Sequence, residues 1–341
     1  MPAQMRASAR DLIQHLILSQ KMSDEIVHLQ GTDHTLAVDV APGRGAEISG
    51  LQVYHEGRWT ETLYRANDFS PTDGWRGRAP WLWPAVGRSS LMQPGDTKPR
   101  VGTWSTGGEE FDIPIHGFAM NCQWDVIRQG ATSVTCGLTS DDQTRGWYPF
   151  DFVLILYVGL SGDSVECMFS VTADAKNVAP MIWSVGNHIT FALPFCDESS
   201  WKECTLSHTG TEQYGLTEHG FISDERIDLG VTTGLSVEDR SLHNGVLGGF
   251  ENGGWEATLS NPNAFDLTVR QECVVGPDEA MKGMLPEHYA LVLWGSEDEQ
   301  YLCPEPWAGL PNSLNSGEGV VSLHPGQKAA WKMTIAAARA S

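Results

Sequence analysis

One carboxylate lies in an unusually restricted stretch of the chain. Glu305 stands between Pro304 and Pro306 and is followed by Trp307. Each proline fixes its own φ and restricts the residue before it, so the backbone around this acid has few conformations to choose from. A carboxylate held still could act as a general base. It could equally cap a turn or pair with an arginine, because charged residues beside prolines in loops are ordinary.

Three further polar side chains, Arg88, His116 and His188, lie in surroundings rich in glycine, proline and aromatic residues. Histidine titrates near neutral pH, so a histidine and a fixed carboxylate could serve as the acid and the base of a proton transfer. A single histidine in a β protein is more often a hydrogen-bonded structural residue, and an arginine after glycine can simply anchor a carboxylate. What favours a functional site is the set of tryptophans within eight positions of the four polar residues: Trp81, Trp83, Trp124, Trp183 and Trp307.

Aromatic platforms beside charged hydrogen-bonding groups are typical of sugar sites, because sugars present apolar C–H faces together with many hydroxyls. We expect most of the 13 tryptophans to fill the core. The sequence has no serine nucleophile elbow, P-loop, dinucleotide fingerprint or H-E-x-x-H motif. The remaining histidines have no ligand-like spacing, so we predict neither a metal nor a cofactor.

The elements that must position these groups are short strands. From residue 26 onward, β-like apolar runs are separated by Gly, Pro, Asn and Asp, and helical periodicity is nearly absent. Residues 289–295 are typical of a buried strand, which places Glu305 in a loop or short strand just beyond it. Residues 320–336, with a Pro325-Gly326 turn, are expected to form a closing hairpin. Many short strands predict an all-β fold, a large antiparallel β-sandwich.

The chain has 341 residues and no linker that would divide it, so we predict one domain over residues 22–341. We interpret residues 1–21 as an N-terminal extension, for which a short helix is one option. Their apolar patch is interrupted by polar residues and lacks the continuous core of a signal peptide.

Charge and cysteine usage limit the partners. The chain has 22 Lys plus Arg against 43 Asp plus Glu, a net charge of -21, which disfavours nucleic acid because such a surface repels phosphates. The longest apolar run has the length of a strand, so no membrane partner is predicted. The seven cysteines are scattered without a C-x-x-C, which favours free thiols in a reducing cytoplasm. The oligomeric state is not predicted.

Five segments give the sequence a resemblance to a known family: RAPWLWPAVGR (78–88), PIHGFA (114–119), NVAPMIWSVGNHITFALP (177–194), CPEPWAGLPNS (303–313) and LHPGQ (323–327). In this order they make the chain resemble the aldose 1-epimerase (galactose mutarotase) superfamily, including its hexose-6-phosphate mutarotase branch, over residues 26–338. The resemblance implies a large antiparallel β-sandwich with the active site in a surface cleft, a sugar substrate and no cofactor.

The resemblance also implies roles for individual residues. His188 matches the histidine that protonates the ring oxygen, and Glu305 matches the glutamate that takes the proton from the anomeric hydroxyl. His116 and Arg88 match residues that hydrogen-bond the sugar. The residues expected to bind the substrate are Arg88, His116, Trp307, Arg78 and Trp83.

The expected activity is therefore interconversion of the α and β anomers of a free aldose. The phosphate-sugar branch usually has an arginine directly after HGFA, where this chain has Met120, although Arg76 and Arg78 could compensate. An acidic residue for a distal hydroxyl is expected among Asp224, Asp228 and Asp239. The alternatives are a non-catalytic carbohydrate-binding or sensing domain, a hexose-phosphate mutarotase, and a glycoside-cleaving enzyme, which would need a second carboxylate.

Overall fold

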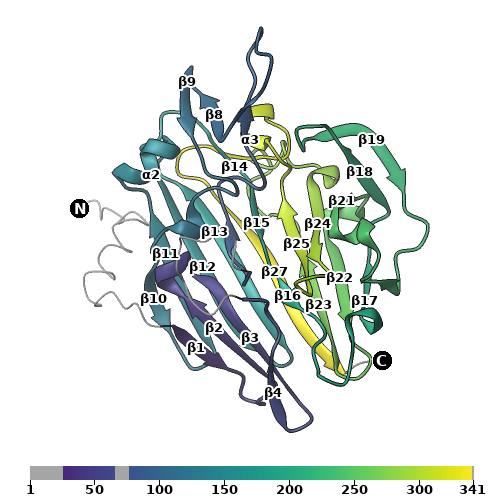
Figure 1. Ribbon diagram of the computed structural model, residues 1–341. Coiled ribbons are helices and arrows are strands. Elements are labelled where there is room, and N and C mark those ends of the chain that lie inside the picture. Colours follow the sequence, from purple (N-terminus) through teal and green to yellow (C-terminus); the bar gives the residue numbers. More distant parts are fainter. Residues whose placement is uncertain (1–25, 66–76, 340–341) are drawn as a thin grey trace, which may run out of the picture.

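The computed structural model describes residues 26–65 and 77–339, and these residues form an all-β protein with few helical turns (Figure 1). The predicted fold class is thus confirmed. The predicted extension, residues 1–21, lies outside the described residues, and so does Arg76. The single domain over residues 22–341 stays a prediction. Within the described ranges, none of the helices combines the length and the apolarity that crossing a bilayer would require.

The largest sheet is antiparallel throughout and forms the rear layer of the molecule in Figure 1. Its nine strands follow one another across the sheet in the order β10 (Asp125–Gln129), β11 (Ser133–Thr139), β12 (Phe152–Ser161), β13 (Ser164–Ala173), β27 (Lys328–Arg339), β23 (Phe265–Gln271), β22 (Trp255–Ser260), β17 (Thr205–His208) and β20 (Leu235–Ser236).

The second large sheet has eight strands and is also antiparallel. Its main path runs in the order β19 (Ile222–Asp228), β18 (Glu212–Leu216), β21 (Asn244–Gly248), β24 (Tyr289–Ser296), β25 (Tyr301–Ala308), β15 (Val185–Asn187) and β5 (Trp81–Leu82), and β16 (Phe191–Ala192) pairs with β25 beside that path. This sheet contains Glu305.

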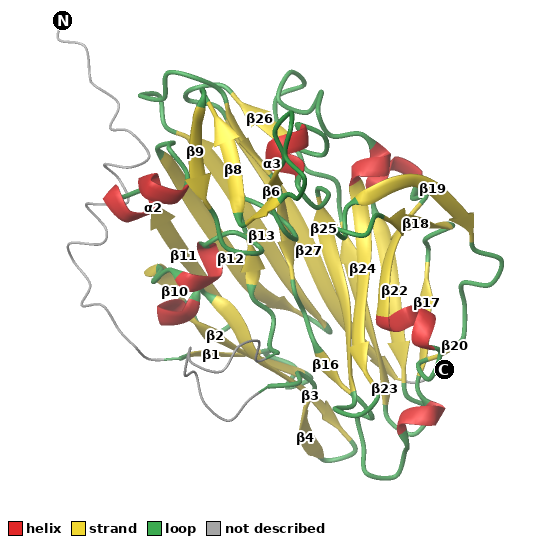
Figure 2. Ribbon diagram, turned by 45° about the horizontal axis from the view of Figure 1, so that its top comes forward, coloured by secondary structure: helices red, strands yellow, loops and turns green. Residues whose placement is uncertain are grey.

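A four-stranded sheet stands beside these two, in the order β1 (Val27–Gln30), β2 (Leu36–Ala41), β3 (Glu47–His55) and β4 (Arg58–Glu61). Three short pairs complete the strands: β14 (Met181–Trp183) with β26 (Val321–Leu323), β6 (Ser90–Leu91) with β7 (Arg100–Val101), and β8 (Thr103–Thr106) with β9 (Glu109–Asp112). Within residues 26–65 and 77–339, the α-helices are α2 (Asp142–Trp147) and α3 (Ser313–Ser316). The 3-10 turns of the same residues are η1 (Pro42–Arg44), η3 (Ala119–Asn121), η4 (Trp201–Glu203), η5 (Arg240–His243), η6 (Glu251–Gly253) and η7 (Pro286–His288) (Figure 2).

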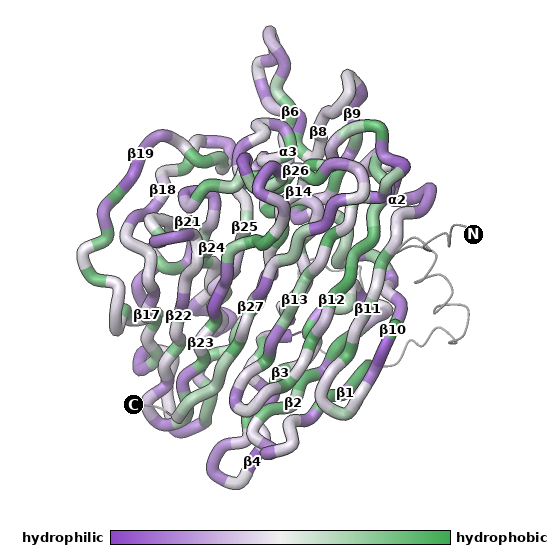
Figure 3. The backbone as a smooth tube through the Cα atoms, turned by 180° about the vertical axis from the view of Figure 1, so that it is seen from behind, coloured by the Kyte–Doolittle hydropathy of each residue, from purple (hydrophilic) through white to green (hydrophobic). Residues whose placement is uncertain are grey.

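The alternation of residue types explains why the nine-stranded sheet has one buried and one outer face. Along β13 every second side chain is buried, namely Val165, Cys167, Phe169 and Val171, whereas Glu166 and Met168 are exposed. Successive residues of a strand point to opposite faces, so this pattern directs one set to the core. In the view from behind, hydrophilic and hydrophobic residues interleave along these strands (Figure 3).

Hydrogen bonds connect the two large sheets through their core. Trp255 on β22 donates its indole N–H to the carbonyl of Ala290 on β24 at 3.2 Å, and the Gln271 amide on β23 donates to the carbonyl of Trp307 at 3.3 Å. Buried polar groups need such partners. The strand with Glu305 is therefore fixed from behind by the nine-stranded sheet.

The prediction of a C-terminal hairpin is wrong. A turn does form at Pro325-Gly326, where Gly326 has φ +83°, but the strands on its two sides have different partners. β26 pairs with β14, while β27 pairs with β13 on one edge and β23 on the other. The long apolar alternation of β27 suits a central strand of the larger sheet, and it pairs there over its whole length.

Candidate active site

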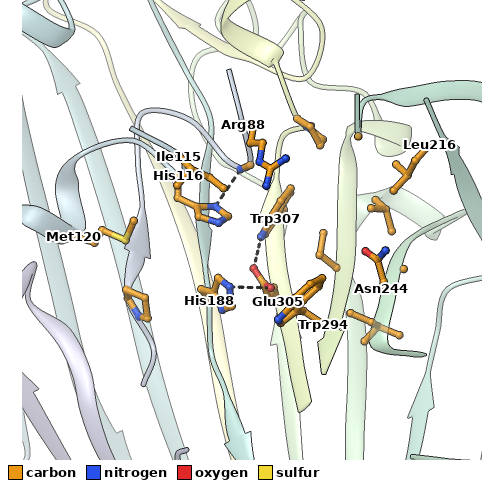
Figure 4. Close-up of a pocket in the computed structure, with 18 of the residues that line it drawn as sticks. Arg88, Ile115, His116, Met120, His188, Leu216, Asn244, Trp294, Glu305 and Trp307 are labelled. Atoms are coloured by element: carbon orange, nitrogen blue, oxygen red, sulfur yellow. Dashed lines mark hydrogen bonds and ion pairs between the residues drawn. The ribbon is translucent and has the colours of Figure 1, made fainter. Parts of the chain in front are cut away.

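The structure brings His188 and Glu305 together, 117 positions apart in the chain. His188 Nε2 lies 3.3 Å from Glu305 Oε1, with side-chain exposures of 11% and 3%. The other carboxylate oxygen, Oε2, accepts a hydrogen bond of 3.1 Å from the indole Nε1 of Trp307 (Figure 4). One oxygen of the acid is thus fixed, and the other faces the imidazole.

Glu305 lies within β25, not in a loop or short strand beyond a core element, so that prediction is wrong. All eight residues of β25 pair with β24, with Glu305 opposite Val292. On its other edge β25 pairs with β16 at Tyr301 and Leu302, and with β15 only at Trp307 and Ala308. Pairing on that edge is therefore interrupted between Leu302 and Trp307.

The two prolines fit this interruption. Backbone N–H groups alternate between the two edges of a strand, so Pro304 and Pro306 place their ring nitrogens on the same edge. A proline cannot donate to a ladder, and it is tolerated where no ladder partner is waiting. The sequence therefore leaves this edge of β25 open opposite His188, which is how an acid within a strand can face a histidine.

His188 is held in the gap by the chain segment on its far side. Its backbone N–H donates to the carbonyl of Pro80 at 3.0 Å, and the N–H of Thr190 donates to the carbonyl of Arg78 at 2.9 Å. The buried Asn187 adds a side-chain bond of 3.0 Å to the carbonyl of Ala79. Hydrogen bonds on both sides of His188 thus set the direction of its ring.

A tight turn carries His116 to the same cleft. Its backbone has φ +65°, and its N–H donates to the carbonyl of Gly87 at 2.8 Å. The N–H of Gly87 in turn donates to His116 Nδ1 at 3.2 Å. Because Nδ1 accepts this bond, the neutral ring has its proton on Nε2. The ring centroid lies 5.5 Å from that of His188 and 5.7 Å from that of Trp307.

Trp83 does not reach the cleft, contrary to the predicted binding role. Its side chain is fully buried and packs edge-on against Phe118, Tyr148 and Phe152, with centroid distances of 5.5, 5.3 and 4.6 Å. Its carbonyl accepts the N–H of Phe118 at 3.0 Å, just after the turn of His116. Trp83 therefore supports that turn from within the core, since a buried ring cannot contact a ligand.

Burial decides the protonation of the pair. It lowers the pKa of His188 to about 4 and raises the pKa of Glu305 well above its usual range, although the Trp307 hydrogen bond opposes that rise. Both shifts have the same cause, which is the cost of a charge out of water. Burial therefore favours the uncharged forms, a neutral imidazole and a protonated carboxyl. Burial, followed by the nearby His188 and Arg88, also lowers the pKa of His116 to about 3.

The pair lies in the floor of a cleft with a volume of about 1520 Å³. Three arginines line it: Arg44, Arg78 and Arg88. Arg78 is 5% exposed, and its Nε lies 3.6 Å from Glu47 Oε1. Burial raises the pKa of Glu47 to about 7, against the opposing effect of Arg78 and Arg44. Among the described residues, the exposed guanidinium of Arg88 has no ion-pair partner.

The opposite side of the cleft is more apolar and was not predicted. Val292 and Trp294 of β24 and Asn244 and Val246 of β21 line it, together with Leu216 of β18. They stand side by side because Asn244 pairs with Trp294 and Val246 with Val292. Two alternate residues of this segment, Val292 and Trp294, thus lie along the cleft. The alternation of side chains along residues 289–295 is visible in the sequence. Placing one face of this strand on the cleft, however, required knowing that β24 pairs with β21.

The acidic residues expected in the irregular region do not line the cleft in the described part of the chain. Asp224 and Asp228 belong to β19, and Asp239 accepts a hydrogen bond of 2.9 Å from the N–H of Ser241 at the start of η5. Glu218 lines the cleft from that region instead. Its carboxylate lies 3.5 Å from His219 Nε2.

Solved structures share this architecture. A galactose mutarotase related enzyme from Lactobacillus acidophilus matches with a TM-score of 0.72 and 20% identity, covering 93% of this chain and 98% of that one. A galactose 1-epimerase from Lactobacillus acidophilus NCFM matches with a TM-score of 0.65 and 15% identity, covering 94% and 100%. These matches show that the chain has a galactose mutarotase-like fold.

The family follows from the sequence itself. The model of the aldose 1-epimerase family matches residues 40–336, so the chain belongs to that family. The protein LacX of Lactococcus lactis subsp. lactis is 23% identical over 255 residues, which are 71% of this chain and 77% of that protein. The expected family is thus confirmed.

Proposed function

We propose that the protein is an aldose 1-epimerase that interconverts the α and β anomers of a free aldose. The observation that carries this proposal is the distance of 3.3 Å between His188 Nε2 and Glu305 Oε1, two buried groups in the floor of an open cleft. Anomer exchange needs one group that removes the proton of the C1 hydroxyl and one that protonates the ring oxygen. Membership of the aldose 1-epimerase family supports a sugar substrate.

The reaction starts from the form of the pair in which Glu305 is ionised and His188 holds the proton. The pair reaches this form when the proton of the Glu305 carboxyl moves to His188 Nε2, which lies 3.3 Å from Oε1. Glu305 takes the proton of the C1 hydroxyl while His188 donates its own to the ring oxygen, and the C1–ring oxygen bond breaks to give the open-chain aldehyde. Rotation about C1–C2 presents the other face, and ring closure reverses both transfers. Each group thereby regains its initial protonation, so no external proton carrier is required.

The neighbours of the pair have supporting roles. The N–H of Trp307 stabilises the ionised carboxylate at Oε2, where a hydrogen bond to a charged group is worth about 1.5–3 kcal/mol. The Nε2–H of His116 and the guanidinium of Arg88 donate to sugar oxygens. Arg78 and Trp307 also line the cleft, where both can contact the sugar in the binding role predicted for them.

The test is to follow freshly dissolved α-aldoses by polarimetry or NMR with and without the protein. Acceleration that is lost in Glu305→Gln and in His188→Asn, by on the order of 100-fold or more, is the expected result. No acceleration for any hexose or pentose would contradict the proposal, and so would full activity of Glu305→Gln. Sugar-dependent thermal stabilisation without anomer exchange would instead favour a binding or sensing domain.

One observation favours a second candidate, an anionic sugar such as a hexose phosphate. Arg44, Arg78 and Arg88 line the cleft of a chain whose net charge is -21. Arginine suits phosphate and carboxylate because its planar fork donates two hydrogen bonds at once. Met120, which also lines the cleft, takes the position where the phosphate-sugar branch usually has an arginine. A preference in kcat/KM for a hexose 6-phosphate over the free hexose, reduced in Arg44→Gln, would decide for this candidate.

A further inference from the structure

The buried thiol of Cys303 lies beside the acid–base pair, and the proposed reaction does not use this thiol. It lies two residues before Glu305 on β25, and residues two apart in a strand point to the same face. The sulfur, an imidazole nitrogen of His188 and a carboxylate oxygen of Glu305 all lie within 4.8 Å of one another. The three side chains therefore offer one soft, one borderline and one hard ligand atom around a common point.

The spacing of the pair fits a small tetrahedral ion. With Zn–N and Zn–O bonds of about 2.0–2.2 Å, two such ligand atoms stand roughly 3.3–3.5 Å apart. The measured separation of His188 Nε2 and Glu305 Oε1 is 3.3 Å. A rotation of the Cys303 side chain toward the cleft would complete three of the four positions. The fourth faces the cleft, because His188 and Glu305 both line it.

Hydrogen bonds already surround two of the three ligands. The N–H of Trp307 holds the second oxygen of Glu305 at 3.1 Å, which leaves Oε1 available. The Cys303 thiol donates to Thr190 Oγ1 at 3.3 Å, and that hydroxyl donates to the carbonyl of His188 at 3.2 Å. Once the thiol proton has left for solvent, the hydroxyl can rotate from this carbonyl and donate to the thiolate. Outer partners of this kind orient metal ligands and commonly contribute 10–100-fold to affinity.

We propose that His188, Cys303 and Glu305 bind a zinc-class divalent cation, and that the bound cation switches the protein off. A thiolate and an imidazole select zinc, cobalt and cadmium over magnesium and calcium, which prefer all-oxygen sites. The inhibition rests on the proposed function, because the cation would occupy both groups that exchange protons with the sugar. Binding itself does not depend on that function.

Cobalt is the probe for binding, since a Co²⁺–thiolate bond adds a charge-transfer absorption band in the near ultraviolet. Titration of the full chain with Co²⁺ should produce this band with one equivalent, and Zn²⁺ should remove it by displacement. Cys303→Ser should lose the band, and Thr190→Val should bind about 10–100-fold more weakly. The matched control is Cys196→Ser, a partly exposed cysteine elsewhere in the fold, which should keep the band.

Inhibition is measured as the ratio of the mutarotation rate with Zn²⁺ to the rate of the same variant without it. Zn²⁺ should suppress the wild type and Cys196→Ser alike, whereas Cys303→Ser should need at least tenfold more Zn²⁺, with circular dichroism confirming its fold. The absence of the cobalt band in the wild type, or its persistence in Cys303→Ser, would overturn the site. If the protein accelerates no mutarotation at all, the proposed function fails while the cobalt titration still decides the metal site.

Discussion

Trp307 donates its indole N–H to Oε2 of Glu305, two residues earlier on the same strand, at 3.1 Å. This bond lowers the pKa of Glu305 and partly offsets the larger rise that burial causes. It also leaves Oε1 as the oxygen that faces His188. The chemistry of the acid is thus adjusted by a neighbour on its own strand.

Trp307→Phe should lower kcat/KM by about 10–100-fold, because a hydrogen bond to a charged group is worth about 1.5–3 kcal/mol. Without the donor the pKa of Glu305 rises further, so the alkaline limb of the pH–rate profile should move to higher pH. Polarimetry across the pH range measures both effects. A lower rate with an unmoved alkaline limb would mean that the ring only contacts the sugar.

His116→Asn should make the fold more tolerant of acid. The pKa of His116 is about 3 in the folded protein against an ordinary value of 6.5. Between these pH values the unfolded chain binds a proton that the folded chain does not, so this stability is present above pH 6.5 and is lost as the pH falls toward 3. Urea unfolding at pH 7 and at pH 4 should show a smaller loss for the variant, by up to about 3 kcal/mol. An equal loss in both proteins would contradict the neutral, buried imidazole.

Glu47 should affect the pH dependence of the unfolding free energy with the opposite sign to His116, and Glu47→Gln tests this. The pKa of Glu47 is raised to about 7 from 4.5, so its contribution is fully present below pH 4.5 and is lost as the pH rises through 7. The variant should therefore lose less stability than the wild type between pH 5 and pH 8. The exposed Glu109→Gln is the control and should follow the wild type. A Glu47→Gln curve parallel to the wild type would show that Arg78 and Arg44 keep this carboxylate charged throughout.

Substitutions of Trp83 and Trp294 can be compared to distinguish a role in core stability from a role in substrate binding. Trp83 is fully buried, whereas Trp294 is 44% exposed and lines the cleft. Trp83→Ala should cost about 3–5 kcal/mol of unfolding free energy. Trp83→Phe, the milder change, should retain the KM of the wild type. Trp294→Ala should raise KM at nearly unchanged stability, and a raised KM in Trp83→Phe with normal stability would restore the binding role to Trp83.

The β-rich fold and the residues around the reacting centre were predictable from the sequence. Strand alternation indicated the sheets, as along β13, where every second side chain is buried. The four polar residues were found through their unusual neighbours. Glycine, proline and tryptophan around a polar or charged group indicate a place where the backbone departs from a regular strand. The roles of His188 and Glu305 stay predictions until activity is measured.

The missed features depend on long-range pairing, which one strand's pattern does not contain. Trp83 has the composition of a cleft residue, yet its carbonyl binds the turn of His116 and its ring fills the core. Trp294 was attributed to a buried strand, although its pairing with Asn244 places both on the cleft. The C-terminal hairpin failed for the same reason, because a turn does not determine which strands its two arms join.

The interrupted edge of β25 has a consequence for the entropy of catalysis. The two side chains of the proposed acid–base pair, His188 and Glu305, come from hydrogen-bonded backbone. Their mutual orientation is therefore established when the chain folds and would not have to be recovered at each turnover. A residue with an N–H at position 304 or 306 would offer the neighbouring segment a new donor and a reason to close the gap. In this protein Pro304 and Pro306, which have no N–H, keep an unpaired gap in the sheet, where His188 and Glu305, the proposed acid–base pair, face each other.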